Sequence, residues 1–115
     1  MTMAVFTIKE GVILYVSPHI REMLDALVPI WEAFKIPFVI TSGLEGIHGD
    51  PSLHYSGSAF DVRTIFPTSF ENLTWQTHRE EIMRAVVERK RLLPFLQFEL
   101  EKDHLHFEWD ERKRA

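Results

Sequence analysis

The sequence predicts an α+β fold in which a small, mostly antiparallel sheet packs against two main helices. Two segments, 18–35 and 75–93, carry apolar residues at the spacing of amphipathic helices. Two runs near the C-terminus, 95–101 and 104–109, alternate between apolar and polar residues, as half-buried strands do. The length of 115 residues, with 45% hydrophobic and 26% charged residues, is that of a single globular domain, residues 1–115.

The N-terminal segment is predicted to form two short strands and then the first helix. Residues 4–17 are rich in strand-forming side chains, and Gly11 divides them into two runs. Ser17 suits the N-cap of a helix, and Pro18 suits its first position. The apolar positions of the helix over 18–35 are Ile20, Met23, Leu24, Leu27, Trp31 and Phe34.

The middle of the chain predicts two further strands separated by a long loop. Pro29 is expected to bend the first helix or to end its regular part, because proline lacks the backbone N–H. The apolar run over 36–42 then indicates a buried strand. Residues 43–57 are a loop, which leads into another strand over 58–64.

The C-terminal half predicts one helix and a β-hairpin. Residues 66–74 are interpreted as a turn-rich connection, and the second helix is expected over 75–93, with Pro94 directly after it. The alternating runs 95–101 and 104–109 are close enough in sequence to be joined by a tight turn.

The alternation in the last strand places its histidines on one face of the sheet. His104, His106 and Glu108 point to one side, and the other side is apolar and therefore faces the core. In the strand over 58–64, Asp61 likewise points away from the side of its apolar neighbours Phe60 and Val62. We therefore expect a polar sheet surface that carries two histidines and carboxylates.

These polar residues suggest a metal site. The chain contains no cysteine, so any metal must be held by His, Asp or Glu. His54, Asp61 and His106 would supply two imidazoles and one carboxylate and leave one position open, which is the pattern of a catalytic zinc ion. A base must take the proton of the activated water, and both Asp103 and Glu101 are candidates. Two histidines and one carboxylate also occur in iron(II) oxygenases, which is an alternative.

Two short motifs resemble those of a known enzyme family. The segment "SLHYSGSAFD", residues 52–61, fits the pattern S-x-H-x-x-G-x-A-x-D at every defined position, and "DHLHFEW", residues 103–109, follows downstream. Together they resemble the zinc peptidases that include D-Ala-D-Ala carboxypeptidases, vancomycin-resistance D,D-dipeptidases and phage L-alanyl-D-glutamate endolysins. The signalling domain of hedgehog shares that fold. The resemblance covers roughly residues 38–110 and is greatest to the short phage and prophage members.

The resemblance implies roles for individual residues. The zinc ligands would be His54, Asp61 and His106, and Asp103, three residues before the last ligand, would be the general base. His104 would then hydrogen-bond the developing oxyanion. By proximity, Glu101 remains a second candidate for the base.

The substrate-binding residues depart from the family pattern. Many relatives have an arginine soon after a Ser-Gly pair to hold the substrate carboxylate, whereas this chain has Leu44 and Glu45 there. Arg63, on the same face as Asp61, either takes over this role or forms a structural ion pair. His48 either lines the cleft or lies on the loop surface. Two further loop residues have assigned roles, with Tyr55 bordering the substrate and Ser52 bracing the ligand loop.

The expected function is zinc-dependent hydrolysis of peptidoglycan stem peptides, as a D,D-carboxypeptidase or as an endopeptidase of the endolysin type. The alternative is a non-catalytic zinc-bearing structural or partner-binding module of phage type. The sequence leaves open which peptide bond is cut and which oligomer forms.

Charge and hydropathy restrict the partners. The net charge of −4 does not favour nucleic acid, and no apolar run approaches the ~20 residues that span a bilayer. The N-terminus lacks the basic start of a signal peptide. We therefore expect a protein that is cytoplasmic when made and acts on the cell wall if it is released.

Overall fold

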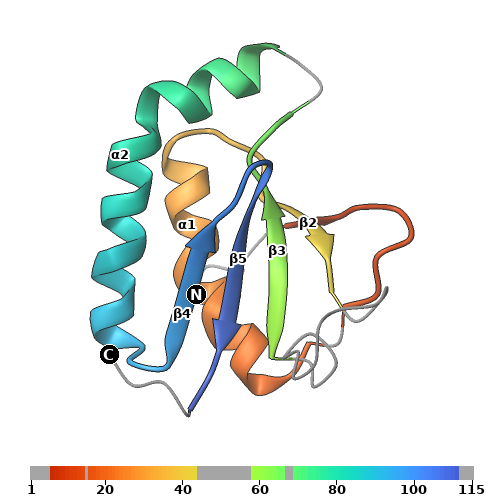
Figure 1. The fold of residues 1–115 in the computed structure, drawn as a ribbon, viewed down its shortest axis with the longest axis vertical. Coiled ribbons are helices and arrows are strands. Elements are labelled where there is room, and N and C mark those ends of the chain that lie inside the picture. The colour runs from red at the N-terminus through yellow and green to blue at the C-terminus, as the bar shows by residue number, and fades with distance from the viewer. Residues whose placement is uncertain (1–5, 15, 44–57, 67–68, 112–115) are drawn as a thin grey trace.

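A five-stranded mixed sheet and two helices make up the part of the chain that the structure describes. This computed structural model describes residues 6–14, 16–43, 58–66 and 69–111. The elements in chain order are β1 (Thr7–Ile8), α1 (Pro18–Ala33), β2 (Val39–Ser42), β3 (Ala59–Arg63), α2 (Ser69–Leu92), β4 (Leu96–Leu100) and β5 (His104–Trp109). Helix α1 crosses behind the sheet, and α2 runs along its β4 side (Figure 1). The predicted α+β class is confirmed.

The sheet has the strand order β1-β2-β3-β5-β4. Only the short β1 pairs in parallel, with β2, and the other three pairings are antiparallel. Strands β4 and β5 form the predicted hairpin, which is closed by the N–H of Glu101 donating to the carbonyl of His104 at 2.8 Å. Strand β5 therefore lies between β3 and β4, and its side chains have neighbours on both sides.

Helix α1 begins as its sequence predicts and ends at Ala33, two residues before the end of the predicted segment 18–35. The Ser17 side chain accepts a hydrogen bond from the N–H of Ile20 at 3.2 Å, and Pro18 occupies the first turn. The helix continues through Pro29 to Ala33, so Pro29 does not end it, and the alternative of a bend at Pro29 stays a prediction. The residues around this proline are buried in the core, and their burial offsets the missing hydrogen bond.

Helix α2 is longer at its N-terminus than the sequence indicated. It begins at Ser69, so residues 69–74, interpreted as a turn-rich connection, are helical instead. This stretch contains neither Gly nor Pro, and its Ser, Asn and Thr lower helix propensity by only tenths of a kcal/mol each. The helix ends at Leu92, two residues before Pro94.

The second strand expected in the N-terminal segment is absent from the described residues. Gly11 makes a turn with φ of 86°, but residues 12–14, which follow it, carry no strand pairing. They pass close to the end of β2, where a Cβ on Gly43 would collide with the backbone carbonyl of Ile13. This segment therefore lies close against the end of β2.

The core lies between the sheet and the helices, on the face opposite the histidines. Phe60 and Val62 of β3 and Leu105 and Phe107 of β5 are completely buried. Trp31 of α1 packs against this layer, with its ring centroid 6.3 Å from that of Phe107. The alternation predicted for β3 and β5 is confirmed, and their polar residues lie on the opposite face.

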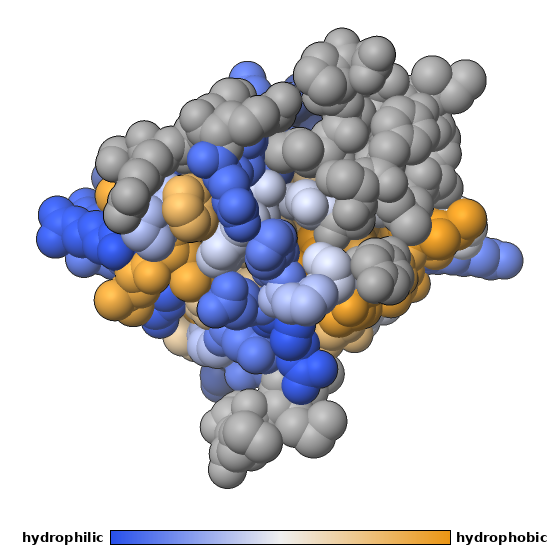
Figure 2. Space-filling view, turned by 90° about the horizontal axis from the view of Figure 1, so that it is seen from below, coloured by the Kyte–Doolittle hydropathy of each residue, from blue (hydrophilic) through white to orange (hydrophobic). Residues whose placement is uncertain are grey.

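Some apolar side chains remain at the surface. In the view from below, hydrophilic residues occupy the middle of the visible face, with hydrophobic patches toward its sides (Figure 2). Leu92, at the end of α2, is the most exposed of the large apolar side chains among the described residues, at 75%. Within these residues, neither helix combines the length and hydropathy needed to cross a membrane.

Truncating Leu105 tests whether the face opposite the histidines forms the core. We expect Leu105→Ala to lower the free energy of unfolding by about 2–5 kcal/mol, because it opens a cavity beneath the site. The matched change Leu92→Ala, at an exposed position, should stay within about 0.5 kcal/mol of the wild type. Urea unfolding followed by circular dichroism measures both, and equal effects would contradict the assigned faces.

Candidate active site

The pairing of β3 with β5 places the polar residues of the two strands side by side. In this antiparallel register Asp61 lies opposite His106, Arg63 opposite His104, and Ala59 opposite Glu108. Directly opposite side chains of neighbouring strands are close enough to interact. Residues far apart in the sequence therefore form one polar surface on the outer face of the sheet.

His106 lies between two carboxylates. Its Nδ1 is 2.8 Å from Oδ1 of Asp61, and its Nε2 is 2.8 Å from Oε1 of Glu108. The three side chains are only 13–20% exposed. Burial lowers the pKa of His106, but the hydrogen bonds to Asp61 and Glu108 outweigh it and hold the pKa above its ordinary value. The imidazole is thus held in one orientation by acids at both nitrogens.

Glu108 determines which nitrogen of His106 is available to a metal. Ionised carboxylates only accept hydrogen bonds, so both nitrogens of His106 donate, Nε2 to Glu108 and Nδ1 to Asp61. If the ring loses its Nδ1 proton to bind a metal beside Asp61, Nε2 still donates to Glu108. A carboxylate behind a metal-binding histidine is a common arrangement that fixes the tautomer and raises the basicity of the ligand.

Asp61 and His106 fit two positions of a zinc site. Zinc ligands at about 2.0–2.2 Å in a tetrahedral arrangement lie about 3.4 Å from each other. The 2.8 Å between Nδ1 and Oδ1 is somewhat shorter, as expected for a direct hydrogen bond, so a small side-chain shift would suffice. Binding requires loss of the His106 proton. An imidazole nitrogen with a carboxylate oxygen is a donor set that suits zinc.

The rest of the predicted ligand set falls outside the described part of the chain. His54, the third expected ligand, lies among residues 44–57, as do the predicted substrate and loop residues His48, Ser52 and Tyr55. Among the residues that the structure describes, no group of three or more His, Asp or Glu side chains is arranged to hold a metal ion. The zinc site therefore remains a prediction.

His104 lies between the two candidate catalytic acids, Asp103 and Glu101. Its Nδ1 donates to Oδ1 of Asp103 at 2.7 Å, and its Nε2 lies 3.3 Å from Oε2 of Glu101 and 3.8 Å from Oδ2 of Asp61. The hydrogen bond with His104 lowers the pKa of Asp103 below its ordinary value, and the Asp103 side chain is 70% exposed. Asp103 is therefore an ionised carboxylate that solvent can reach.

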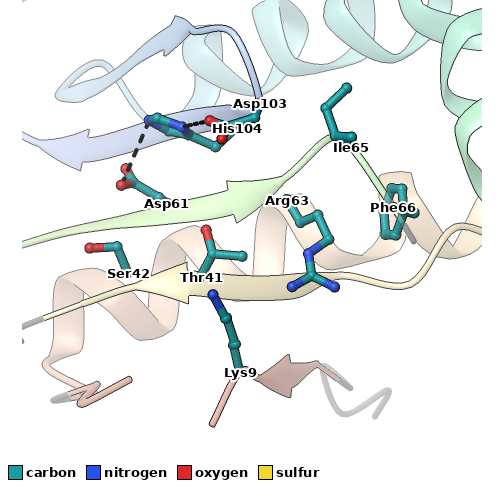
Figure 3. A pocket seen from close by; sticks show the side chains of 9 residues that line it. All are labelled: Lys9, Thr41, Ser42, Asp61, Arg63, Ile65, Phe66, Asp103 and His104. Carbon is teal, nitrogen blue, oxygen red and sulfur yellow. Dashed lines mark hydrogen bonds and ion pairs between the residues drawn. The ribbon is translucent and has the colours of Figure 1, made fainter. Parts of the chain in front are cut away.

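A cavity of about 590 Å³ opens beside these residues. Asp61, His104 and Asp103 line one part of it, and Figure 3 shows their side chains gathered between β3 and β5. Glu101 is not among the lining residues. The volume is within the range of small-ligand sites, about 300–1,000 Å³.

The cavity is also lined by residues for which the sequence predicts no role. Lys9, Thr41 and Ser42 line it, because β1 and β2 continue the sheet beside β3. No local pattern marks Lys9, since only the parallel pairing of β1 with β2 brings it near the site. The spacing predicts that Glu108 lies on the histidine face, but its contact with His106 depends on how the two side chains fold together.

Comparison with protein-family models, with curated proteins and with solved structures gives no match to this chain. The resemblance to the zinc peptidases therefore rests on the two sequence motifs, and the site geometry stands on its own residues.

Removing the negative charge of Glu108 tests its role behind His106. We expect Glu108→Gln to weaken zinc binding about 10–100-fold, because the ligand loses its orienting acceptor and part of its basicity. Glu99→Gln is the matched control, because this substitution removes the same charge. Glu99 is exposed and lies opposite His106 on β4. Competition with a chromophoric chelator measures the affinities. If both variants bind zinc equally weakly, the effect is due to the lost charge alone and not to the contact of Glu108 with His106.

Proposed function

We propose that this chain is a zinc-dependent peptidase that hydrolyses the stem peptides of peptidoglycan, acting on the cell wall after release from the cytoplasm. The observation that carries the proposal is the juxtaposition of two pairs on the outer face of the sheet, Asp61 with His106 and Asp103 with His104. Asp61, Asp103 and His104 line the cavity beside them. The first pair offers metal ligands, and the second offers a base together with a hydrogen-bond donor. The substrate class comes from the resemblance of the two motifs.

Zinc held by His54, Asp61 and His106 would supply a Lewis acid for the scissile carbonyl and would lower the pKa of water to about 7. The protein contributes the fixed donor atoms. Glu108 holds the His106 ring, and the β3–β5 register holds the Asp61 carboxylate beside it. A metal ligand that is already oriented loses little conformational freedom on binding.

Asp103 is the proposed general base. It is ionised, exposed to solvent and lines the cavity, so it can accept a proton from the attacking water. As the peptide C–N bond breaks, the same carboxyl group returns this proton to the departing amine. The hydrogen bond to His104 keeps the carboxylate directed at the site during both transfers.

His104 is the proposed donor to the oxyanion that develops on the carbonyl oxygen. Its Nδ1 donates to Asp103, and its Nε2 lies on the Asp61 side of the cavity, from where it would donate to the oxyanion. A donor fixed before the reaction stabilises developing charge without reorganisation.

Substitution of Asp103 tests the base. We expect Asp103→Asn to reduce the hydrolysis rate by about 10²–10⁴-fold with unchanged zinc content, because proton transfer is lost and the ligands are intact. Glu101→Gln should retain most activity, since Glu101 does not line the cavity. Mass spectrometry of fragments released from defined muropeptides gives both the rate and the bond that is cut.

Three results would contradict the proposal in different ways. A large loss of hydrolysis rate in Glu101→Gln, with full activity in Asp103→Asn, would identify Glu101 as the base. Zinc that is retained in His106→Ala would exclude the ligand set. Stoichiometric zinc with no cleavage of any muropeptide would make the chain a non-catalytic zinc-bearing module.

A further inference from the structure

Strand β2 contains a β-bulge directly beside the candidate site. Its Ile40 pairs with Val62 of β3 and its Ser42 pairs with Asp61, so Thr41 is an extra residue in the register. A bulge changes the direction of the side chains around it, and bulges are over-represented next to active sites. The irregularity therefore lies in the part of β2 that faces the candidate metal ligand Asp61.

The bulge places two successive hydroxyl groups on the same side of the sheet. Ile40 is completely buried in the core, so regular alternation would turn Thr41 to the outer face and Ser42 back to the core. Instead, both Thr41 and Ser42 are partly buried and line the cavity. Figure 3 shows both side chains leaving β2 on the side of Asp61. A regular strand would supply only one of the two hydroxyls.

Neither hydroxyl is occupied by the part of the chain that the structure describes. No side-chain hydrogen bond of Thr41 or Ser42 occurs there, although Ser42 lies opposite Asp61. Asp61 instead accepts a hydrogen bond from Nδ1 of His106. Each hydroxyl can donate one hydrogen bond and accept others, so the pair can serve a ligand in the cavity.

The spacing of the strands relates these hydroxyls to the bond that would be cut. Neighbouring strands lie about 4.8 Å apart, and an extended peptide advances about 3.3–3.6 Å per residue. A peptide whose scissile carbonyl lies over Asp61 and His104, on β3 and β5, therefore reaches β2 about one residue further along. The main-chain amide that it presents there has one donor and one acceptor, which two hydroxyls can match.

We propose that Thr41 and Ser42 form a main-chain anchor that binds the amide next to the scissile bond of the substrate. The inference rests on the proposed peptidase function and adds two substrate-binding residues to it. It also specifies the substrate as a peptide that extends at least one residue beyond the cleaved bond on the β2 side. A dipeptide, whose only amide is the scissile bond, lacks the group that the anchor binds.

Ester analogues of one stem peptide test the anchor. In one analogue an ester replaces the amide before the scissile bond, and in the other an ester replaces the amide after it, so each analogue lacks one N–H donor. We expect one of the two replacements to raise the KM of the wild type about 3–10-fold, because one hydrogen bond is lost. The kcat should change little, since the contact is made equally in the ground state and the transition state.

Variants connect this discrimination to the two hydroxyls. Thr41→Val and Ser42→Ala should each raise the KM for the all-amide peptide about 3–10-fold and reduce the discrimination against the sensitive ester. Thr41→Ser keeps the hydroxyl and should retain the discrimination. Thr77→Val on α2 removes a hydroxyl at an exposed site outside the cavity and should leave the KM unchanged. Equal thermal midpoints show that the variants are folded.

Zinc affinity and peptide binding provide readouts that do not depend on turnover. Ser42→Ala should bind zinc as tightly as the wild type, and a weaker zinc affinity with an unchanged KM would make Ser42 a support of Asp61 and overturn the anchor. Calorimetry on the chelator-treated protein should show weaker binding of the sensitive ester. Equal binding and equal cleavage of all three peptides would overturn the anchor and leave the peptidase function intact. Selective binding without any cleavage would instead contradict the peptidase function and retain the anchor.

Discussion

The antiparallel register between β3 and β5 is the constraint on which the candidate site depends. It brings Asp61 opposite His106 and Arg63 opposite His104, although each pair is widely separated in the sequence. Side chains alternate along a strand, so a slip of one residue would turn Asp61 toward the core and end its contact with His106. The 2.8 Å contact between these two side chains exists only in this register.

The apolar face of the same two strands holds that register in place. Phe60 and Phe107 lie directly opposite each other with ring centroids 5.7 Å apart, and both are completely buried. A slipped register would expose these rings and bury the charged groups instead, and both changes are unfavourable. The core beneath the sheet therefore determines the geometry of the polar face above it, and the helices contribute to the site by covering that core.

On the outer face, acidic and basic groups are interleaved in a way that limits repulsion. His106 lies between Asp61 and Glu108, and His104 lies between Asp103 and Glu101. Each imidazole contacts the carboxylates on its two sides and so holds them in place.

The sequence by itself determined the faces of the strands, the position of α1 and the hairpin. The two-residue period of 104–109 is a local property, and it is enough to place His104 and His106 on one side. Tertiary structure decided the rest: the early start of α2 at Ser69, the contact of Glu108 with His106, and the place of Lys9 in the cavity. Periodicity indicates which way a side chain points. Strand pairing and core packing determine which residues from distant segments become its neighbours.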